Sequence, residues 1–363
     1  MRYWNPDMEL LPPRSIKELQ NRKLRAMIRD RMSRHHPFYR GMFRSAGIDP
    51  CSISHSDDLI KLPFTTVENL THTPDFFMLS STDRFLEGLS LISMMEGLVY
   101  GAARGRHGQS NKGIGMNRPV MEIGHAIEPG RRVNLSGHDL KLFKELCGRS
   151  GLCCGMSPED IFLNAHPYGR GLDFWHSYYM SSVSLGCSSF SPGHDVPSGP
   201  IMRPTIVSGS ADRLLEMVDA PWCELKFDRV RKVLLATGDG CRDQQVKRSF
   251  GEAGISPEVL LSYPVVECRQ SFYEYSPGSG FHTCPDVHLW ECIDPDTGES
   301  VGPEERGELV FTSIEGRGSL FLRYRTGDIA EGGITYEPCQ DCGRTVPRII
   351  GPIRRTNGSV HEN

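Results

Sequence analysis

The stretch KVLLATGDG, residues 232–240, is the most informative about the fold because it joins an expected buried strand to a glycine-rich turn. Its apolar run is short and ends at Gly-Asp-Gly, which is typical of a strand that leads directly into a turn. Amphipathic helical repeats flank it, in ADRLLEMVDA (211–220) and RDQQVKRSFGEAGI (242–255). A strand between two such helices predicts an α/β unit with parallel strands.

Three further apolar runs extend the same alternation of strand and helix: DIFLNA, RPTIVSGS and EVLLSYPV, at 160–165, 203–210 and 258–265. In open sheets of this kind, ligands collect at the carboxyl ends of the strands. Two of the expected strands end in turns that contain Gly or Pro, in ATGDGC and SYPVVE. A ligand site is therefore expected near residues 236–241 and 262–267.

The two ends of the chain follow other patterns. Residues 14–46 carry Leu, Ile and Met at helical spacing among many charges, and we expect them to be helical. The part after 285 predicts short strands in HLWECID, GELVFTSI and SLFLRYR, at 288–294, 307–314 and 319–325, with a hairpin turn at DPDTGES, 294–300. We expect an α/β fold with mixed and parallel sheets, flanking helices and a small late β-rich subdomain.

Composition excludes several classes of protein. The 363 residues carry a net charge of −4, which does not predict a nucleic-acid-binding surface. No apolar run is long enough to cross a bilayer, and the N-terminal MRYWNPDMEL lacks the apolar core of a signal peptide. Twelve cysteines without such a signal predict reduced thiols, some of which could bind metal, instead of a disulfide framework. We expect a cytoplasmic protein that contacts neither nucleic acid nor membrane.

Short motifs in one consistent order give the strongest indication of family. They are YWNP, HPFYR, LPFTT, IDPDTGE, GELVFT, RYRTGD and CGRTVPRI, which begin at residues 3, 36, 62, 293, 307, 323 and 342. Together they resemble the phenylacetate–coenzyme A ligase branch of the adenylate-forming enzymes, over nearly the whole chain. The resemblance implies that ATP activates a carboxylate as an acyl adenylate, and that the acyl group then passes to a thiol, usually coenzyme A.

The resemblance also implies a nucleotide site. Asp328, which follows Thr-Gly, matches the carboxylate that accepts both ribose hydroxyls; the alternative is a solvated turn aspartate. Tyr263 matches the aromatic residue that stacks on adenine, and Glu267 the ligand that holds Mg²⁺ against the phosphates; the alternatives are a core tyrosine and a surface glutamate. Five further residues are expected to bind the nucleotide: Gly238, Asp239, Gly240, Ser262 and Arg355.

The segment LNAHPYGRGLDFW, residues 163–175, resembles the region where the acyl pocket of the family begins. His166, Tyr168, Gly169 and Phe174 are expected to line the path of the carboxylate, and His166 is also a candidate catalytic residue. A structural histidine is the alternative for His166. The aromatic content of this segment favours an aryl or otherwise flat carboxylic acid as the substrate.

A separate pattern predicts a zinc ion. The CQDC motif, residues 339–342, has the two-residue spacing that lets two thiolates face one ion, and structural zinc sites need about four ligands. Some members of the family hold structural zinc with matching Cys and His residues. The resemblance therefore assigns Cys268, His282, Cys339 and Cys342, with Cys284 and His288 in reserve. Reduced thiols and imidazoles without metal are the alternative.

Two departures from the family pattern stand out. The Ser/Thr/Gly-rich phosphate loop is missing from 91–115, where Met94, Met95 and Glu96 replace small hydroxyl residues; Lys112 in GQSNKGIG could take over part of its role, or that segment is a surface loop. The family also continues into a C-terminal lid domain with a catalytic lysine, which we expect to be absent here. The expected division is 1–90 helical, 91–285 α/β core, 286–353 β-rich and 354–363 a remnant of the hinge.

Two functions remain open at this level. One is an enzyme that uses ATP and Mg²⁺ to adenylate a carboxylic acid and transfers the acyl group to coenzyme A or to an acyl-accepting protein. The other is a non-catalytic relative that binds AMP, an acid or a partner protein, which the missing phosphate loop favours. The retained Tyr263, Glu267 and Asp328 favour the enzyme. The sequence leaves open whether the chain forms a homodimer.

Overall fold

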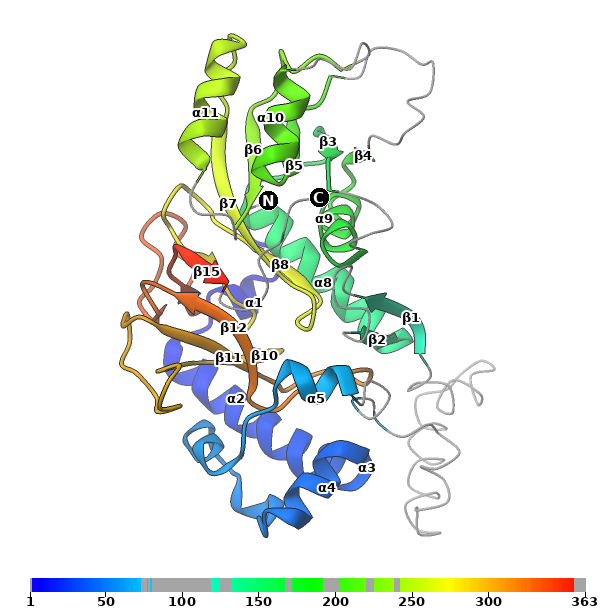
Figure 1. Ribbon diagram of the computed structural model, residues 1–363, viewed down its shortest axis with the longest axis vertical. Helices are drawn as coiled ribbons and strands as arrows, with labels where there is room; N and C mark the ends of the chain where they lie inside the picture. Colours follow the sequence, from blue (N-terminus) through cyan, green and yellow to red (C-terminus); the bar gives the residue numbers. More distant parts are fainter. Residues whose placement is uncertain are drawn as a thin grey trace.

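The computed structural model describes residues 2–72, 77, 79, 119–124, 132–166, 172–191, 203–219, 225–237 and 242–355. The late strands β10, β11 and β12 lie between the N-terminal helices and a larger α/β sheet (Figure 1). Of the residues called in the sequence, Lys112, Tyr168, Gly169, Gly238, Asp239 and Gly240 lie outside the described part, as do Met94, Met95 and Glu96. No helix within the described part is long and apolar enough to cross a membrane.

The larger sheet has the order β4-β3-β5-β6-β7-β8, in which β8 alone is antiparallel to its neighbour. Helices cover both faces, because successive strand residues point to opposite sides. Val207 and Val233 pack against α10 and α11, whereas Ile206 and Leu234 pack towards Tyr178 of α9. The elements are β3 Ile161–Asn164, β4 Ser188–Phe190, β5 Ile206–Gly209, β6 Lys232–Ala236, β7 Glu258–Val265, β8 Gln270–Tyr273, α8 Gly137–Cys153, α9 Leu172–Ser184, α10 Ala211–Asp219 and α11 Asp243–Glu252.

Three smaller sheets complete the described β structure. A four-stranded antiparallel sheet has the order β10-β11-β12-β15, a three-stranded one the order β13-β14-β9, and β1 pairs with β2. Their strands are β1 Pro119–Gly124, β2 Arg132–Ser136, β9 Phe281–His282, β10 His288–Ile293, β11 Gly307–Ser313, β12 Tyr324–Ala330, β13 Ile334–Thr335, β14 Arg348–Ile349 and β15 Ile353–Arg355. The α/β prediction, with mixed and parallel sheets and a late β-rich part, is confirmed.

The N-terminal region is helical, as expected, but it is divided into short elements. His36 has an extended backbone, and its Nδ1 accepts a hydrogen bond from Tyr39 N at 3.4 Å, so it caps the helix that begins at Pro37. Proline is favoured at a first helical position because its missing N–H has no intrahelical partner there. The elements are α1 Pro6–Glu9, α2 Pro13–Ala26, the π-helix Met27–Met32, α3 Ser33–His35, α4 Pro37–Ser45, the 3₁₀ turns Pro50–Ser52 and Ser56–Lys61, and α5 Val67–His72.

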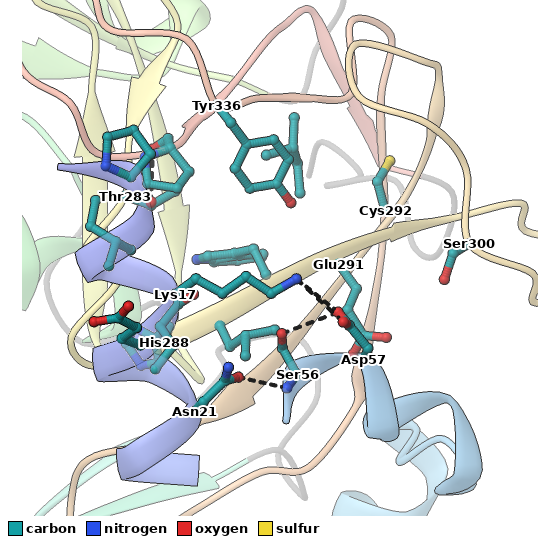
Figure 2. A pocket seen from close by; sticks show the side chains of 18 of the residues that line it. Lys17, Asn21, Ser56, Asp57, Thr283, His288, Glu291, Cys292, Ser300 and Tyr336 are labelled. Carbon is teal, nitrogen blue, oxygen red and sulfur yellow. Dashed lines mark hydrogen bonds and ion pairs between the residues drawn. The ribbon is translucent and has the colours of Figure 1, made fainter. Parts of the chain in front are cut away.

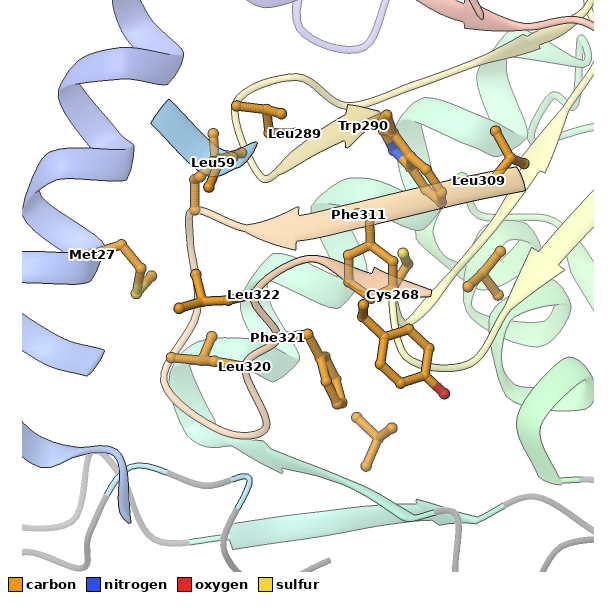
Figure 3. Packing of buried hydrophobic residues seen from close by; sticks show 14 of the residues in the cluster. Met27, Leu59, Cys268, Leu289, Trp290, Leu309, Phe311, Leu320, Phe321 and Leu322 are labelled. Carbon is orange, nitrogen blue, oxygen red and sulfur yellow. The ribbon is translucent and has the colours of Figure 1, made fainter. Parts of the chain in front are cut away.

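One hydrophobic cluster joins the N-terminal helices to the late strands (Figure 3). Met27 of the π-helix and Leu59 of the 3₁₀ turn belong to the same buried cluster as Phe311 of β11 and Leu322. Burying an aliphatic or aromatic side chain contributes about 1.5–3 kcal/mol. The sheet β10-β11-β12-β15 is therefore held from the side of the N-terminal helices.

The prediction of a strand over 319–325 is wrong in its position, because the strand is Tyr324–Ala330. The apolar residues Leu320, Phe321 and Leu322 are fully buried without belonging to a strand. Side chains satisfy the backbone there: Leu322 N donates to the Tyr39 hydroxyl at 2.7 Å, and Arg323 N to Thr312 Oγ1 at 2.9 Å. The apolar run correctly indicated that these residues are buried. Burial does not require a strand, because irregular chain can also be buried when its backbone groups have other hydrogen-bond partners.

Candidate nucleotide and acid site

Asp328 lies inside strand β12, directly opposite Arg355 of β15. Its Oδ2 accepts a hydrogen bond from the Tyr263 hydroxyl at 2.7 Å, and its Oδ1 lies 3.5 Å from Arg355 Nε. Arg355 also donates to the carbonyl of Pro264 at 2.9 Å. Asp328 is only 6% exposed, so the alternative of a solvated turn aspartate is wrong.

A local irregularity of β12 sets the direction of Asp328. The register between β11 and β12 shifts between Glu308 and Val310, opposite Thr326, Gly327 and Asp328. Gly327 has a φ of +74°, a conformation that glycine adopts without steric cost. The Thr326 hydroxyl donates to the Leu309 carbonyl at 2.8 Å and accepts from Asp328 N at 3.1 Å. The Thr-Gly-Asp sequence therefore forms a bulge within a strand, where we had expected a strand end.

Glu267 lies in the tight turn that joins β7 to β8, in which Arg269 N donates to the Val266 carbonyl at 2.8 Å. Its side chain points inwards and is 1% exposed, so the alternative of a surface glutamate is wrong. The Tyr324 hydroxyl donates to Glu267 Oε1 at 2.8 Å. Tyr324 stood in the RYRTGD motif, yet sequence reasoning gave it no role, because this contact spans 57 positions.

A buried ion pair holds the same turn from its far side. Arg269 Nη1 donates to Asp139 Oδ1 at 2.8 Å, with the side chains 1% and 0% exposed. Asp139 also accepts from the backbone N–H of Gly318 at 2.7 Å and lies in the first turn of α8, which Ser136 caps. Arg269 has a φ of +58°, which is uncommon for a residue other than glycine. The turn that carries Glu267 is thus fixed by contacts from two distant parts of the chain.

Ser262 and His166 come together through a residue that the sequence did not single out. The side chain of Ser262 points to the opposite side of β7 from Tyr263, and it exchanges a short hydrogen bond with the Tyr178 hydroxyl. The His166 ring stacks on the Tyr178 ring, with centroids 4.2 Å apart. Tyr178 of α9 therefore connects the carboxyl ends of β3 and β7. Of Phe174, the structure describes the backbone only, as part of α9.

Burial dominates the ionisation of this cluster. It lowers the pKa of His166 to about 3, so the imidazole is neutral at ordinary pH. Burial, together with the negative charge of Asp328, raises the pKa of Tyr263 well above its usual value. The Tyr263 hydroxyl is therefore a permanent donor to the carboxylate. The Tyr263 ring is 0% exposed and packs near Phe272 and Phe281.

Three of the four predicted zinc ligands converge. The ligand atoms of His282, Cys339 and Cys342 lie within 4.8 Å of one another, and all three residues are buried. Cys342 Sγ lies 3.2 Å from His282 Nε2. The second imidazole nitrogen, Nδ1, lies 3.5 Å from the sulfur of Cys153, a residue that sequence reasoning missed. Imidazole and thiolate donors in this number fit a zinc ion with one further position.

Cys268 does not belong to this group of three. It packs in the hydrophobic cluster that holds Phe311 and Leu322, and burial raises the pKa of its thiol. The reserve candidates lie elsewhere too: Cys284 Sγ accepts from Gln270 Nε2 at 3.3 Å, and His288 faces Phe311 edge-on. The family resemblance assigned Cys268 as a ligand, but the turn at 266–269 directs its side chain into the hydrophobic cluster.

Comparison with known proteins gives one consistent result. No family model matches the chain. The phenylacetate–coenzyme A ligase of Thermus thermophilus is 26% identical over 96% of this chain and 72% of its own length, and that of Pseudomonas putida is 22% identical over 97% and 73%. A solved structure of 2-hydroxyisobutyryl-CoA ligase with 2-HIB-AMP and CoA superposes with a TM-score of 0.72, at 18% identity, over 97% of this chain and 72% of its own. The fold is that of this ligase.

Proposed function

We propose that this chain, a relative of the phenylacetate–coenzyme A ligases with the adenylate-forming fold, uses ATP to convert a carboxylic acid into an acyl adenylate and passes the acyl group to a thiol. The single observation that carries this proposal is the buried set Asp328, Tyr263 and Glu267. The three residues come from two separate motifs, SYPVVE and RYRTGD, and each has its polar group held by a hydrogen bond. A structural role alone does not require three such groups at the carboxyl end of β7 and on β12.

Asp328 has the capacity for a ribose. A carboxylate offers about four acceptor positions, and here Oδ2 accepts from the Tyr263 hydroxyl while Oδ1 lies 3.5 Å from Arg355 Nε. A ribose with two hydroxyl donors would add two charge-assisted hydrogen bonds. The Tyr263 ring, which we propose stacks on the base, is 0% exposed among the described residues, and residues 238–241 lie outside that part.

Glu267 fits Mg²⁺ as a single protein carboxylate. Mg²⁺ keeps several waters and takes one or two carboxylates when phosphates supply other oxygens. Tyr324 holds one oxygen of Glu267, which leaves the direction of the carboxylate fixed before a ligand arrives. Such a cation would offset the charge that develops as pyrophosphate leaves. His166, as a neutral buried imidazole, would line the path of the acid instead of carrying charge.

A structural zinc ion at His282, Cys339 and Cys342 is part of the proposal. What supports it is the chemistry of the donors, and the sulfur of Cys153 beside the other imidazole nitrogen, where partners of ligating histidines usually lie. The fourth position would be taken by water or a group outside the three. Such an ion would join β9 to the loop before β14 and stabilise the folded state.

Coenzyme A is the acceptor we favour, because 2-hydroxyisobutyryl-CoA ligase was solved with CoA in this fold. An acyl-accepting protein is the alternative acceptor, and a homodimer is the alternative to a monomer.

We also propose a reducing, cytoplasmic location. Ten described cysteines are free, and nine of them are buried. A flat aryl acid is the preferred substrate, given the stacked Trp175 and Tyr179 on α9.

The experiment is pyrophosphate exchange with the purified chain, measured against a panel of aryl, short-chain and fatty acids. The proposal expects exchange that depends on ATP, Mg²⁺ and one class of acid, and that is lost in Glu267→Gln. If no acid supports exchange while AMP still binds, the non-catalytic alternative is correct. AMP binding measured on the same preparation separates that outcome from a misfolded protein.

A further inference from the structure

A cavity of about 800 Å³ opens along the outer edge of β10, opposite helix α2 (Figure 2). Its wall includes Lys17 and Asn21 from α2, Trp290 and Glu291 from β10, and Tyr336 above them. The volume lies in the range of sites that bind small ligands or short peptides, about 300–1,000 Å³. Asp328, Tyr263 and Glu267 do not line it, so it is a site separate from the proposed nucleotide site.

The backbone of β10 presents an open edge to this cavity. On one side β10 pairs with β11, where the Val287 carbonyl accepts from Ile314 N at 2.9 Å. On the other side the Cys292 carbonyl accepts from Val301 N at 3.0 Å. Because the N–H and C=O groups of successive strand residues point to alternate edges, those of Trp290 point the same way as those of Cys292. The described part of the chain gives the two backbone groups of Trp290 no hydrogen-bond partner.

Some residues of the cavity wall also carry buried side-chain atoms that have no partner among the described residues. They are the indole Nε1 of Trp290 and Oε2 of Glu291, whose Oε1 holds Arg323 at 3.1 Å. Both ring nitrogens of His288, a residue that is 0% exposed, share this property. Most buried polar atoms in proteins have a hydrogen-bond partner. These atoms are themselves shielded from solvent, and the Trp290 ring packs near Phe311 with centroids 5.4 Å apart, so the open backbone edge is the feature that a ligand can reach.

Charge and exposure restrict the kind of ligand. The ionised lining residues comprise two cations, Arg14 and Lys17, and three anions, Glu18, Asp57 and Glu291, which sum to −1. Lys17 is further neutralised by Asp57 at 3.1 Å. Glu291 is likewise paired with Arg323 at 3.1 Å, so the lining offers no surplus positive charge for phosphate, nucleotides or coenzyme A. Two lining residues, Ile60 and Tyr336, are 68% and 50% exposed, which provides apolar contact at the mouth.

The free edge is also short. At one end His288 N donates to the Cys284 carbonyl at 3.0 Å, and at the other end the chain itself covers Cys292. A second copy of β10 would need a longer open edge, so an edge-to-edge dimer does not fit. The N–H and the C=O of Trp290 need an acceptor and a donor from the ligand. A ligand that supplies both must carry a C=O and an N–H attached to the same carbon atom. A peptide residue in the extended conformation has that arrangement.

We propose that an extended, non-acidic peptide segment of a partner protein binds in this cavity, pairs with the outer edge of β10 at Trp290, and places an apolar side chain beneath Tyr336. The segment would be short, because the chain closes both ends of the edge. This site would recruit a partner without occupying the residues proposed for adenylation.

The test uses the blocked tetrapeptide acetyl-Val-Thr-Val-Thr-amide, whose β-branched residues favour the extended state. The ¹⁵N–¹H indole signals of the full chain are recorded during titration, and Trp290→Phe assigns the signal of Trp290. We expect a saturable shift of that signal with a Kd of about 1 mM or below. Tyr336→Ala should weaken binding several-fold, whereas Tyr179→Ala, which removes another partly exposed tyrosine, should leave it unchanged.

A matched peptide with N-methyl groups on both central residues cannot form the backbone pair and should not bind. Equal binding by that peptide would overturn the proposal, since it would show an apolar pocket without edge pairing. The proposal would also be overturned if the indole signal of Trp290 did not shift when acetyl-Val-Thr-Val-Thr-amide is added. A signal that shifts with protein concentration when no peptide is present would overturn it as well. Melting temperatures of each variant confirm that the chain is folded.

Discussion

The hydroxyl of Tyr263 donates a 2.7 Å hydrogen bond to Asp328, 65 positions later in the chain, and so joins the end of β7 to β12. The donor is an uncharged phenol and the acceptor a buried carboxylate, a pairing that is stronger than one between two neutral groups. Two motifs that sequence comparison treats as separate therefore act as one structural unit.

Tyr263→Phe tests the strength of that unit. The variant removes a buried hydrogen bond to a charged group, and we expect the free energy of unfolding to fall by about 1.5–3 kcal/mol. Tyr273→Phe is the matched control, because its hydroxyl is equally buried but lies 3.4 Å from Ser181 Oγ. Urea denaturation of both variants checks the difference. Equal losses would contradict the special role of the Asp328 contact.

Asp328→Ala should lower AMP affinity roughly ten- to a hundredfold, the value of a buried charge-assisted hydrogen bond. Calorimetric titration with AMP provides the measurement. Asp294→Ala, in the exposed hairpin turn, removes a carboxylate far from the proposed ribose and should leave the affinity unchanged. Unchanged AMP binding in a folded Asp328→Ala variant would refute the ribose assignment.

Tyr324→Phe should weaken the binding of Mg²⁺ more than the binding of AMP. Without the phenol, Glu267 loses a hydrogen bond to a charged group of about 1.5–3 kcal/mol, which corresponds to roughly a ten- to a hundredfold change. We expect the Mg²⁺ concentration for half-maximal pyrophosphate exchange to rise by about that factor, while AMP affinity stays the same. A loss of AMP affinity without a change in Mg²⁺ dependence would contradict the assignment of Glu267.

Metal analysis tests the proposed zinc site. We expect about one zinc per chain, a lower melting temperature after chelation, and loss of the metal in Cys339→Ser and Cys342→Ser. Cys292→Ser, which changes a buried cysteine outside the cluster, should retain it. Cys153→Ala should weaken zinc binding by about 10- to 100-fold without abolishing it, because this residue contacts the other nitrogen of His282. A preparation that never contains zinc contradicts the site.

Acid should destabilise the protein through His36. Burial lowers the pKa of His36 to about 3 from its usual 6.5, so the unfolded chain binds the proton more readily. The stability that the neutral ring contributes is complete above pH 6.5 and is lost as pH falls from 6.5 towards 3. His36→Asn keeps a capping side chain, and its free energy of unfolding should fall less steeply in this window, by up to about 1.4 kcal/mol per pH unit. Equal slopes would contradict this prediction.

Local pattern was sufficient for much of the fold. The strands at 160–165, 203–210, 232–236 and 258–265 were predictable because each is a short apolar run between amphipathic helices, which has few other solutions. The apolar run at 319–325 shows the limit of the same reasoning. Residues 320–322 are apolar because they are buried, not because they form a strand. The strand begins at Tyr324, since side chains of Tyr39 and Thr312 satisfy the backbone N–H groups of Leu322 and Arg323 before it.

Sequence patterns were enough to single out the candidate residues: Asp328 after Thr-Gly, Glu267 four residues after Tyr263, and the CQDC motif. Only the tertiary structure decided how these side chains are held. Tyr324 on Glu267, Tyr178 between Ser262 and His166, and Cys153 beside His282 are contacts between distant positions, and they depend on how packed layers align. The same limit explains Cys268: adjacency to Glu267 suggested a metal ligand, but the turn at 266–269 directs its side chain into the hydrophobic core.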